Sequence, residues 1–191
     1  MSTARLTPAS YVVLGLVEGW QPATPYELKR AAELGVVNLW SVPHTQLYAE
    51  PARLANVGLL VEEREEGGRR RKRYSLTDKG RRALAEWRAS PTAEMTELRD
   101  PGLLKLFFGA PPRPLAQAQL EVHRHRLASY EKQRRAVGDA LPRGVRLALE
   151  AGVGHEREWT RFWARVLREE PVADDAGGVE SSADRRTRTR G

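Results

Sequence analysis

The sequence has 191 residues, of which 40% are hydrophobic and 30% are charged, and its formal net charge is +7. This composition is typical of one or two soluble domains. Cysteine is absent, which excludes disulfides, thiol nucleophiles and thiolate metal sites. The N-terminus lacks a charged leader followed by an apolar run, and the longest apolar stretch, residues 11–17, is too short to cross a bilayer. We therefore expect a cytoplasmic protein without a membrane partner.

Two helix starts are predicted near the N-terminus. Thr7-Pro8 and Thr24-Pro25 each place a capping hydroxyl before a proline at the first helical position. Glu27 completes a capping box with Thr24. The helix that follows Pro8 is apolar nearly all round over residues 11–17, which predicts that it is covered on more than one side, in small domains often by another subunit.

A third helix is predicted from Ser41 to about Asn56. Its apolar spine is Leu47, Pro51 and Leu54, and the opposite face carries small and polar side chains together with Tyr48. Proline inside a helix removes a backbone hydrogen bond at a cost of roughly 3 kcal/mol. We therefore expect a kink or a break near residues 49–51.

Two alternating segments, residues 59–65 and 70–76, predict a β-hairpin whose turn is Glu66-Gly67-Gly68-Arg69. Residues 69–73 are five consecutive cations. A charge run is usually only a solvated face. A helix followed by a hairpin with a basic tip, however, is typical of a winged helix-turn-helix, in which the helix enters the major groove and the tip contacts phosphates. A fourth helix begins at Thr77-Asp78.

The second half of the chain predicts helices only. Asp100-Pro101 begins a short helix that ends at Gly109, and prolines 111, 112 and 114 predict a stiff link. Residues 115–137 and 142–170 repeat apolar positions at alternating spacings of four and three, which predicts an antiparallel helical pair. From residue 171 onwards Gly, Ser, Asp and Arg dominate, which predicts disorder.

The predicted fold is therefore mainly α with a small β-hairpin. Residues 5–90 are expected to form a winged helix-turn-helix DNA-binding domain. Residues 100–170 are expected to form a C-terminal antiparallel helical region for dimerisation and effector binding, and residues 171–191 a disordered tail.

Several segments together resemble PadR-type transcriptional regulators. They are residues 6–16, Thr24-Pro25-Tyr26-Glu27-Leu28-Lys29, Gln46-Leu47-Tyr48, the Glu-Gly-Gly-Arg turn and Tyr74-Ser75-Leu76-Thr77-Asp78-Lys79-Gly80, with residues 99–109 similar to the start of the family's C-terminal region. The resemblance implies a dimeric, usually repressing, DNA-binding protein. It also implies that the C-terminal helices pair the subunits, and some members sense small aromatic or drug-like ligands. The family usually has an aliphatic or polar residue where this chain has Pro51.

These arguments define two sets of candidate residues. The candidate DNA contacts are Lys29, Ser41, His44, Thr45, Gln46, Tyr48, Arg69, Arg70, Arg71, Lys72 and Arg73. The candidate dimerisation or effector residues are Tyr11, Leu14, Leu120, Leu127, Tyr130, Trp159, Phe162 and Trp163. The predicted function is a homodimeric regulator, a repressor, that binds a pseudo-palindromic operator in double-stranded DNA and is released by a small hydrophobic or aromatic ligand.

No catalytic, metal or cofactor site is predicted. His155-Glu156 begins like a zinc-protease motif, but Trp159 stands where the second histidine would be. The four histidines are interpreted as structural or surface residues. Two alternatives remain: a winged-helix module that binds proteins and lacks autonomous DNA binding, and a small-molecule enzyme on a helical scaffold, which the residues do not favour.

Overall fold

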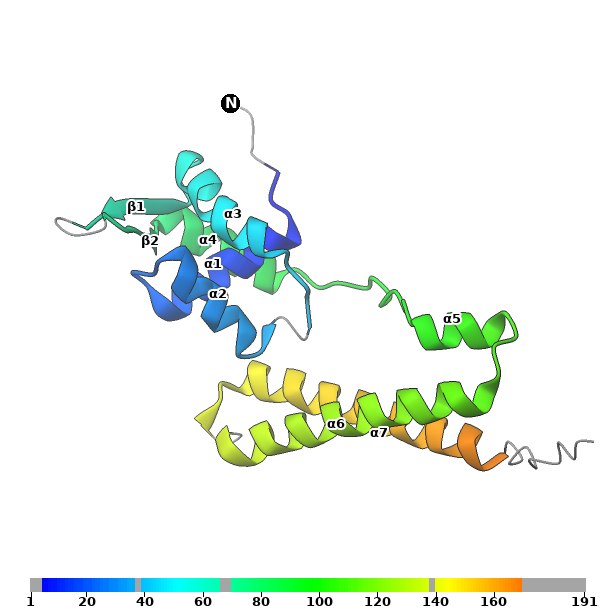
Figure 1. Cartoon of the computed structure of the whole chain (residues 1–191). Helices are drawn as coiled ribbons and strands as arrows, with labels where there is room; N and C mark the ends of the chain where they lie inside the picture. The colour runs from blue at the N-terminus through cyan, green and yellow to red at the C-terminus, as the bar shows by residue number, and fades with distance from the viewer. Residues whose placement is uncertain (1–4, 37–38, 66–69, 138–139, 170–191) are drawn as a thin grey trace, which may run out of the picture. The chain divides into compact units, whose positions relative to one another are not determined.

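The computed structural model describes residues 5–36, 39–65, 70–137 and 140–169, so the predicted turn at residues 66–69 and the predicted tail from residue 171 lie outside it. The chain divides into two compact units, residues 1–97 and 98–191. The elements, shown in Figure 1, are α1 (Pro8–Trp20), α2 (Pro25–Glu33), α3 (His44–Asn56), β1 (Leu60–Arg64), β2 (Lys72–Leu76), α4 (Asp78–Ala89), α5 (Pro101–Phe107), α6 (Pro112–Val137) and α7 (Arg143–Glu169).

Local capping sets the first two helix starts, as predicted. At α2 the Thr24 backbone N–H donates to Glu27 Oε2 at 2.8 Å, and the Glu27 N–H donates to Thr24 Oγ1 at 3.3 Å. At α1 the same reciprocal box joins Thr7 and Ser10. Each box satisfies backbone donors that a helix N-terminus leaves without intrahelical partners.

The start and the interior of α3 differ from the prediction. The helix begins at His44 rather than Ser41, and Pro43 occupies the capping position without a side-chain cap. The physical reason is that a proline disfavours helical geometry in the residue before it, so Val42 cannot belong to the helix. Of the predicted kink or break near Pro51, the break is wrong, because α3 continues through this residue to Asn56. The Pro51 ring is fully buried, so packing offsets the lost hydrogen bond.

The hairpin of the N-terminal unit is antiparallel, with Leu60 opposite Leu76, Glu62 opposite Tyr74 and Arg64 opposite Lys72. A third backbone segment joins it at Ala23, whose N–H and carbonyl bond Tyr74 at 3.0 and 2.9 Å. The hairpin packs with α1 to α4 around one core, whose buried side chains include Val13, Leu14, Val17, Leu28, Leu47, Leu54, Leu60, Tyr74, Leu76 and Leu84.

The C-terminal unit is built from α5, α6 and α7. Helix α6 begins at Pro112 rather than residue 115, because prolines fit the first turn of a helix, where no intrahelical N–H bond is lost. Helices α6 and α7 run side by side as a hairpin (Figure 1). Ala116, Leu120 and Trp163 form the buried centre of the pair. The predicted antiparallel pairing is confirmed.

Two contacts fix how closely α6 and α7 approach. A Cβ at Gly152 would lie 3.2 Å from Tyr130 Cε2, so the glycine accommodates the tyrosine ring. Further along, His123 Nδ1 lies 2.6 Å from Glu156 Oε2, and Arg126 Nε lies 3.5 Å from Glu156 Oε1. Glu156 is only 4% exposed, so the seam contains a partnered carboxylate rather than a purely apolar contact.

Candidate nucleic-acid interface

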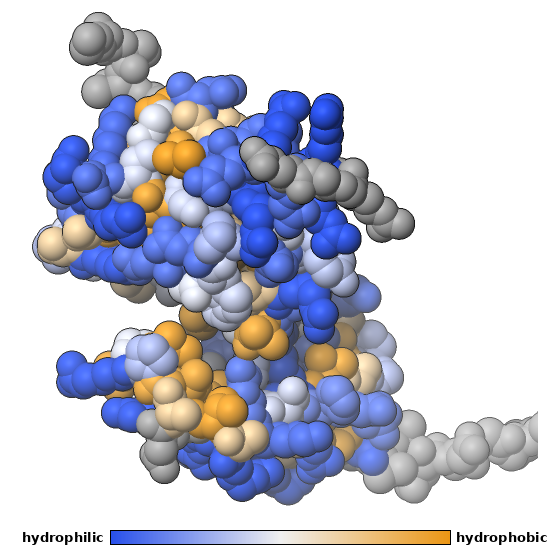
Figure 2. Space-filling model, turned by 90° about the vertical axis from the view of Figure 1, so that its left-hand side faces the viewer, coloured by the Kyte–Doolittle hydropathy of each residue, from blue (hydrophilic) through white to orange (hydrophobic). Residues whose placement is uncertain are grey.

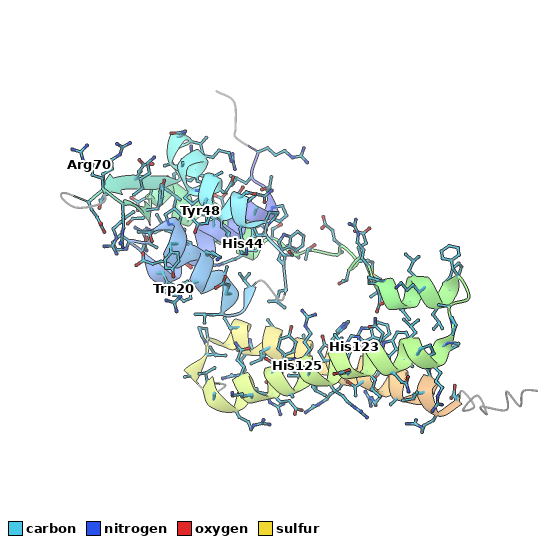
Figure 3. All side chains as sticks on the ribbon, in the orientation of Figure 1. Trp20, His44, Tyr48, Arg70, His123 and His125 are labelled. Atoms are coloured by element: carbon cyan, nitrogen blue, oxygen red, sulfur yellow. The ribbon has the colours of Figure 1, made fainter. Side chains whose placement is uncertain are left out.

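Helix α3 presents a polar face away from the core of the N-terminal unit. Leu47, Pro51 and Leu54 point inward and are buried. Tyr48 is 48% exposed, and Figure 3 shows His44 and Tyr48 on this helix. The other candidate positions of this region, Ser41, Thr45 and Gln46, are also exposed. The predicted contacts of this segment are therefore all accessible.

The chemistry of this surface suits the floor and edges of a DNA groove. Gln46 has a carboxamide that can pair with the edge of adenine, and Tyr48 has a hydroxyl that can donate to a phosphate. Ala49 is small and exposed, so it leaves the helix backbone free to approach closely. The helix can therefore combine base contacts with phosphate contacts.

The cations of the hairpin are not equivalent. Lys72 Nζ forms an ion pair of 2.9 Å with Glu62 Oε1. Arg73 donates to the Pro22 carbonyl at 3.0 Å and lies 3.6 Å from Glu65. Arg70 and Arg71 are exposed, and no salt bridge within the described part of the chain engages them. Arg69 lies outside the described residues. Two of the predicted wing cations thus point to solvent, whereas two are held by the fold.

Hydrogen bonds that the sequence did not reveal hold the hairpin together and attach it to the rest of the unit. The Tyr74 hydroxyl donates to Glu62 Oε2 at 3.0 Å, and burial, followed by this hydrogen bond, raises the pKa of Tyr74 to about 12. The Leu76 N–H donates to Gln21 Oε1 at 2.8 Å. The first bond joins the two strands of the hairpin, and the second ties β2 to Gln21, the residue that follows α1.

Lys29 lies on α2, where its Nζ is 3.5 Å from Glu33 Oε1, one turn further along the helix. Its side chain is 29% exposed. Pairs of this kind contribute only a few tenths of a kcal/mol, roughly 0.3–0.5, so Lys29 can exchange its partner for a phosphate.

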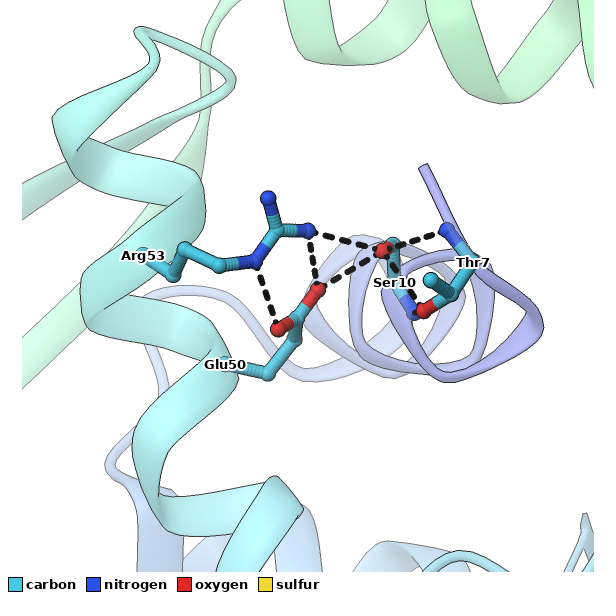
Figure 4. A network of polar contacts seen from close by, with 4 residues as sticks. All are labelled: Thr7, Ser10, Glu50 and Arg53. Atoms are coloured by element: carbon cyan, nitrogen blue, oxygen red, sulfur yellow. Dashed lines mark hydrogen bonds and ion pairs between the residues drawn. The ribbon is translucent and has the colours of Figure 1, made fainter. Parts of the chain in front are cut away.

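A polar network joins α3 to α1 (Figure 4). Arg53 donates from Nε to Glu50 Oε2 at 2.8 Å and from Nη2 to Glu50 Oε1 at 2.6 Å. Ser10 is fully buried and donates to Glu50 Oε1 at 2.7 Å. Burial alone raises the pKa of the Glu50 carboxyl, but the hydrogen bonds from Arg53 and Ser10 lower it by more, so the pKa lies below its ordinary value. Sequence reasoning missed this network because Ser10 and Glu50 are forty positions apart.

The candidate dimerisation and effector residues divide into buried and accessible groups. Leu14, Leu120 and Trp163 are buried inside their own units, so they offer no exposed surface to a second subunit. Tyr11 stacks on Trp87 of α4 at 4.7 Å between ring centroids. Half-buried or buried side chains along α6 and α7 complete the set: Leu127, Tyr130, Trp159 and Phe162.

Aromatic rings gather on α7. Trp159 and Phe162 meet edge to face at 5.6 Å, and Phe162 and Trp163 at 4.9 Å. The Trp163 Nε1 and Thr160 Oγ1 atoms are buried without a hydrogen-bond partner among the residues that the structure describes. Buried polar atoms usually have partners, so this cluster is a place where a ligand or water could supply them.

The surface of the C-terminal unit carries apolar side chains. In the space-filling view they form orange groups on the helical unit in the lower part of the picture (Figure 2). The exposed large apolar residues of this unit are Leu98, Leu104, Phe107, Phe108, Val122, Val137, Val145 and Leu147. No helix within the described ranges is both long and apolar enough to cross a membrane.

The hairpin, the exposed helix α3 and the helix pair α2–α3 define a winged helix-turn-helix. Residues 13–86 match the transcriptional regulator PadR-like family, and residues 98–169 match the virulence activator alpha C-terminal region. Residues 13–86 therefore form a domain of the PadR-like type, and the matches together identify a PadR-type transcriptional regulator. It is therefore a DNA-binding transcriptional regulator rather than an enzyme.

Solved structures share this fold. Bacillus subtilis PadR in complex with operator DNA has a TM-score of 0.76 at 20% identity, over 86% of this chain and 98% of that chain. The same protein in complex with p-coumaric acid has a TM-score of 0.68 at 20% identity, over 85% and 97%. The Vibrio cholerae virulence activator AphA has a TM-score of 0.64 at 26% identity, over 84% and 96%. No protein of curated function matches the sequence.

Proposed function

We propose that the chain acts as a homodimeric repressor on a pseudo-palindromic operator. Each subunit inserts α3 into a major groove and places its wing on the adjacent backbone. The observation that carries this proposal is the exposed polar face of α3 together with the exposed cations Arg70 and Arg71, which no salt bridge among the described residues engages. Repression follows from occupation of promoter DNA.

The proposed dimer rests on the helical unit. Leu104, Phe107 and Phe108 of the α5 region are 60%, 84% and 77% exposed, and exposed apolar patches of this kind mark interaction surfaces. A two-fold dimer presents two copies of α3, so its operator has half-sites about 34–36 Å apart, one helical turn, or a multiple of that spacing.

The proposed inducer is a small aromatic or hydrophobic ligand. Support comes from the rings of Trp159 and Phe162, from the unpartnered Trp163 Nε1 within the described chain, and from the p-coumaric acid bound by a protein of the same fold. A ligand that binds the DNA-free arrangement better than the DNA-bound one shifts the population toward release. Tryptophan fluorescence during a titration with p-coumaric acid checks this part of the proposal.

Binding of the full chain to the DNA upstream of its own gene, across a salt series, tests the main proposal. We expect a steep loss of affinity with rising salt, because each neutralised phosphate releases counterions. Absence of binding at low ionic strength would instead favour the protein-interaction module.

Sedimentation of the full chain, compared with sedimentation of residues 1–97, tests which part of the chain pairs the subunits. If the shorter chain dimerises equally well, the helical unit does not pair the subunits.

A further inference from the structure

Arg53 is held in one orientation while one end of its guanidinium stays free. Its Nε and Nη2 bond Glu50, and Nη2 also donates to Ser10 Oγ at 3.0 Å. No acceptor in the described part of the chain bonds Nη1, and the Arg53 side chain is 40% exposed. Figure 4 shows Nη1 pointing away from Glu50 and Ser10.

The acceptors around Arg53 are themselves fully committed. Ser10 Oγ donates to Glu50 and also accepts from the Thr7 backbone N–H at 2.9 Å. Glu50 accepts hydrogen bonds from both Nε and Nη2 of Arg53, and its side chain is only 13% exposed. The pair therefore cannot swing outward easily, and the free Nη1 donors have a fixed direction.

The position of Arg53 on α3 matches the proposed DNA face. Gln46 and Arg53 are seven residues apart, which is two helical turns, so they lie on one side of the helix about 10 Å apart along its axis. Gln46 is exposed and Arg53 is half-buried on the same side. A helix that reads bases near Gln46 in a major groove about 12 Å wide would bring Arg53 to the strand that borders the groove.

Resting on the proposed function, we infer that Arg53 is a further DNA-binding residue, which donates from Nη1 to one backbone phosphate while Glu50 and Ser10 position it. A guanidinium already fixed by bidentate bonds loses less side-chain freedom on binding than a free lysine or arginine. The contact sets the register of α3 in the groove and carries no base preference of its own.

The test is a salt series of promoter binding with wild type and Arg53→Ala. Loss of one phosphate contact lowers the magnitude of the slope of log K against log [salt] by about 0.9. A purely structural arginine would lower the melting temperature and leave this slope unchanged. If Arg53→Ala does not fold, Arg53→Gln, which keeps a donor for Glu50 and lacks the charge, carries the same slope measurement.

Two variants serve as matched controls. Ser10→Ala removes one of the two groups that position Arg53 but no charge, so it should lower stability and weaken binding, with a smaller change in slope than Arg53→Ala. Arg88→Ala removes another exposed arginine of the same unit that bonds a glutamate, Glu18, and it should leave the slope intact. An unchanged slope for Arg53→Ala, or an equal reduction for Arg88→Ala, overturns the inference. A wild type without salt-dependent binding refutes the proposed function itself.

Discussion

Tyr74 and Glu62 lie opposite each other on β2 and β1, and the tyrosine hydroxyl donates to the carboxylate at 3.0 Å. Tyr74 is 1% exposed, while Lys72 reaches the same carboxylate from two residues away. One glutamate thus joins a buried phenol to a cation of the wing. The stability of the base of the wing therefore depends on the protonation states of Tyr74 and Glu62.

Alkaline pH should weaken the N-terminal unit through Tyr74. Its pKa is raised from 10.0 to about 12, so the unfolded chain loses this proton first, and stability present below pH 10 falls as pH rises toward 12. The full effect is roughly 3 kcal/mol. Denaturant titrations between pH 9 and 12 should show this decline in wild type and a smaller one in Tyr74→Phe. Equal declines in both proteins would contradict the assignment.

Charge removal at the wing tip should weaken binding to all DNA sequences. The double variant Arg70→Ala/Arg71→Ala should lower the magnitude of the salt slope by about 1.8, because both side chains face solvent and each is assigned one phosphate. Lys72→Ala should have a smaller effect, since Lys72 is already paired with Glu62. Binding isotherms with operator DNA and with unrelated DNA duplexes, each across a salt series, measure the affinity and the slope. A loss confined to the operator would show base readout by the tip instead.

Gly80 of α4 has no room for a side chain. A Cβ there would lie 2.1 Å from the Leu59 carbonyl oxygen and 3.1 Å from Leu76 Cδ2. Gly80→Ala should therefore force backbone shifts and destabilise the N-terminal unit by roughly 1–3 kcal/mol or more. Gly154→Ala in α7 is the matched control, because nothing lies within 4 Å of its Cβ and alanine favours a helix by about 1 kcal/mol. Thermal unfolding should move in opposite directions for the two variants.

The buried carboxylate of Glu156, between α6 and α7, should contribute more to stability than the exposed carboxylate of Glu158. Glu156→Ala leaves His123 and Arg126 without their acceptor and should cost roughly 1.5–3 kcal/mol. Glu158→Ala, two residues away, removes an exposed partner of Arg161 and should change stability by less than about 0.5 kcal/mol. Chemical denaturation followed by tryptophan fluorescence compares them. Similar losses of stability in the two variants would show that the buried carboxylate contributes no more than the exposed one.

Short-range patterns explain what could be predicted from the sequence. The Thr24–Glu27 box and the spine of Leu47 and Leu54 depend on residues within one or two helical turns, so their spacing alone was sufficient. The pairing of β1 with β2 followed equally from alternation around a glycine turn. The exposure of Tyr48 followed from the same helical period.

Sequence patterns were insufficient where packing decides the outcome. The sequence predicted a kink or a break of α3 near Pro51, yet the ring of Pro51 is buried in the core and the helix continues. Leu14, Leu120 and Trp163 have the character of interface residues in the sequence, but neighbouring elements of their own units cover them. No single-segment pattern reveals which of two apolar surfaces will cover a side chain.

The sequence by itself determined the starts of α1 and α2, the hairpin and the run of cations that leads into β2, because these depend on neighbours along the chain. Only the tertiary structure decided which of the described cations are exposed and which are held. Ser10 meets Glu50 across forty positions, and Arg73 meets Pro22 across fifty-one. Contacts at such separations exist only after the core has brought the elements together, so burial and geometry rather than spacing assign each arginine its partner.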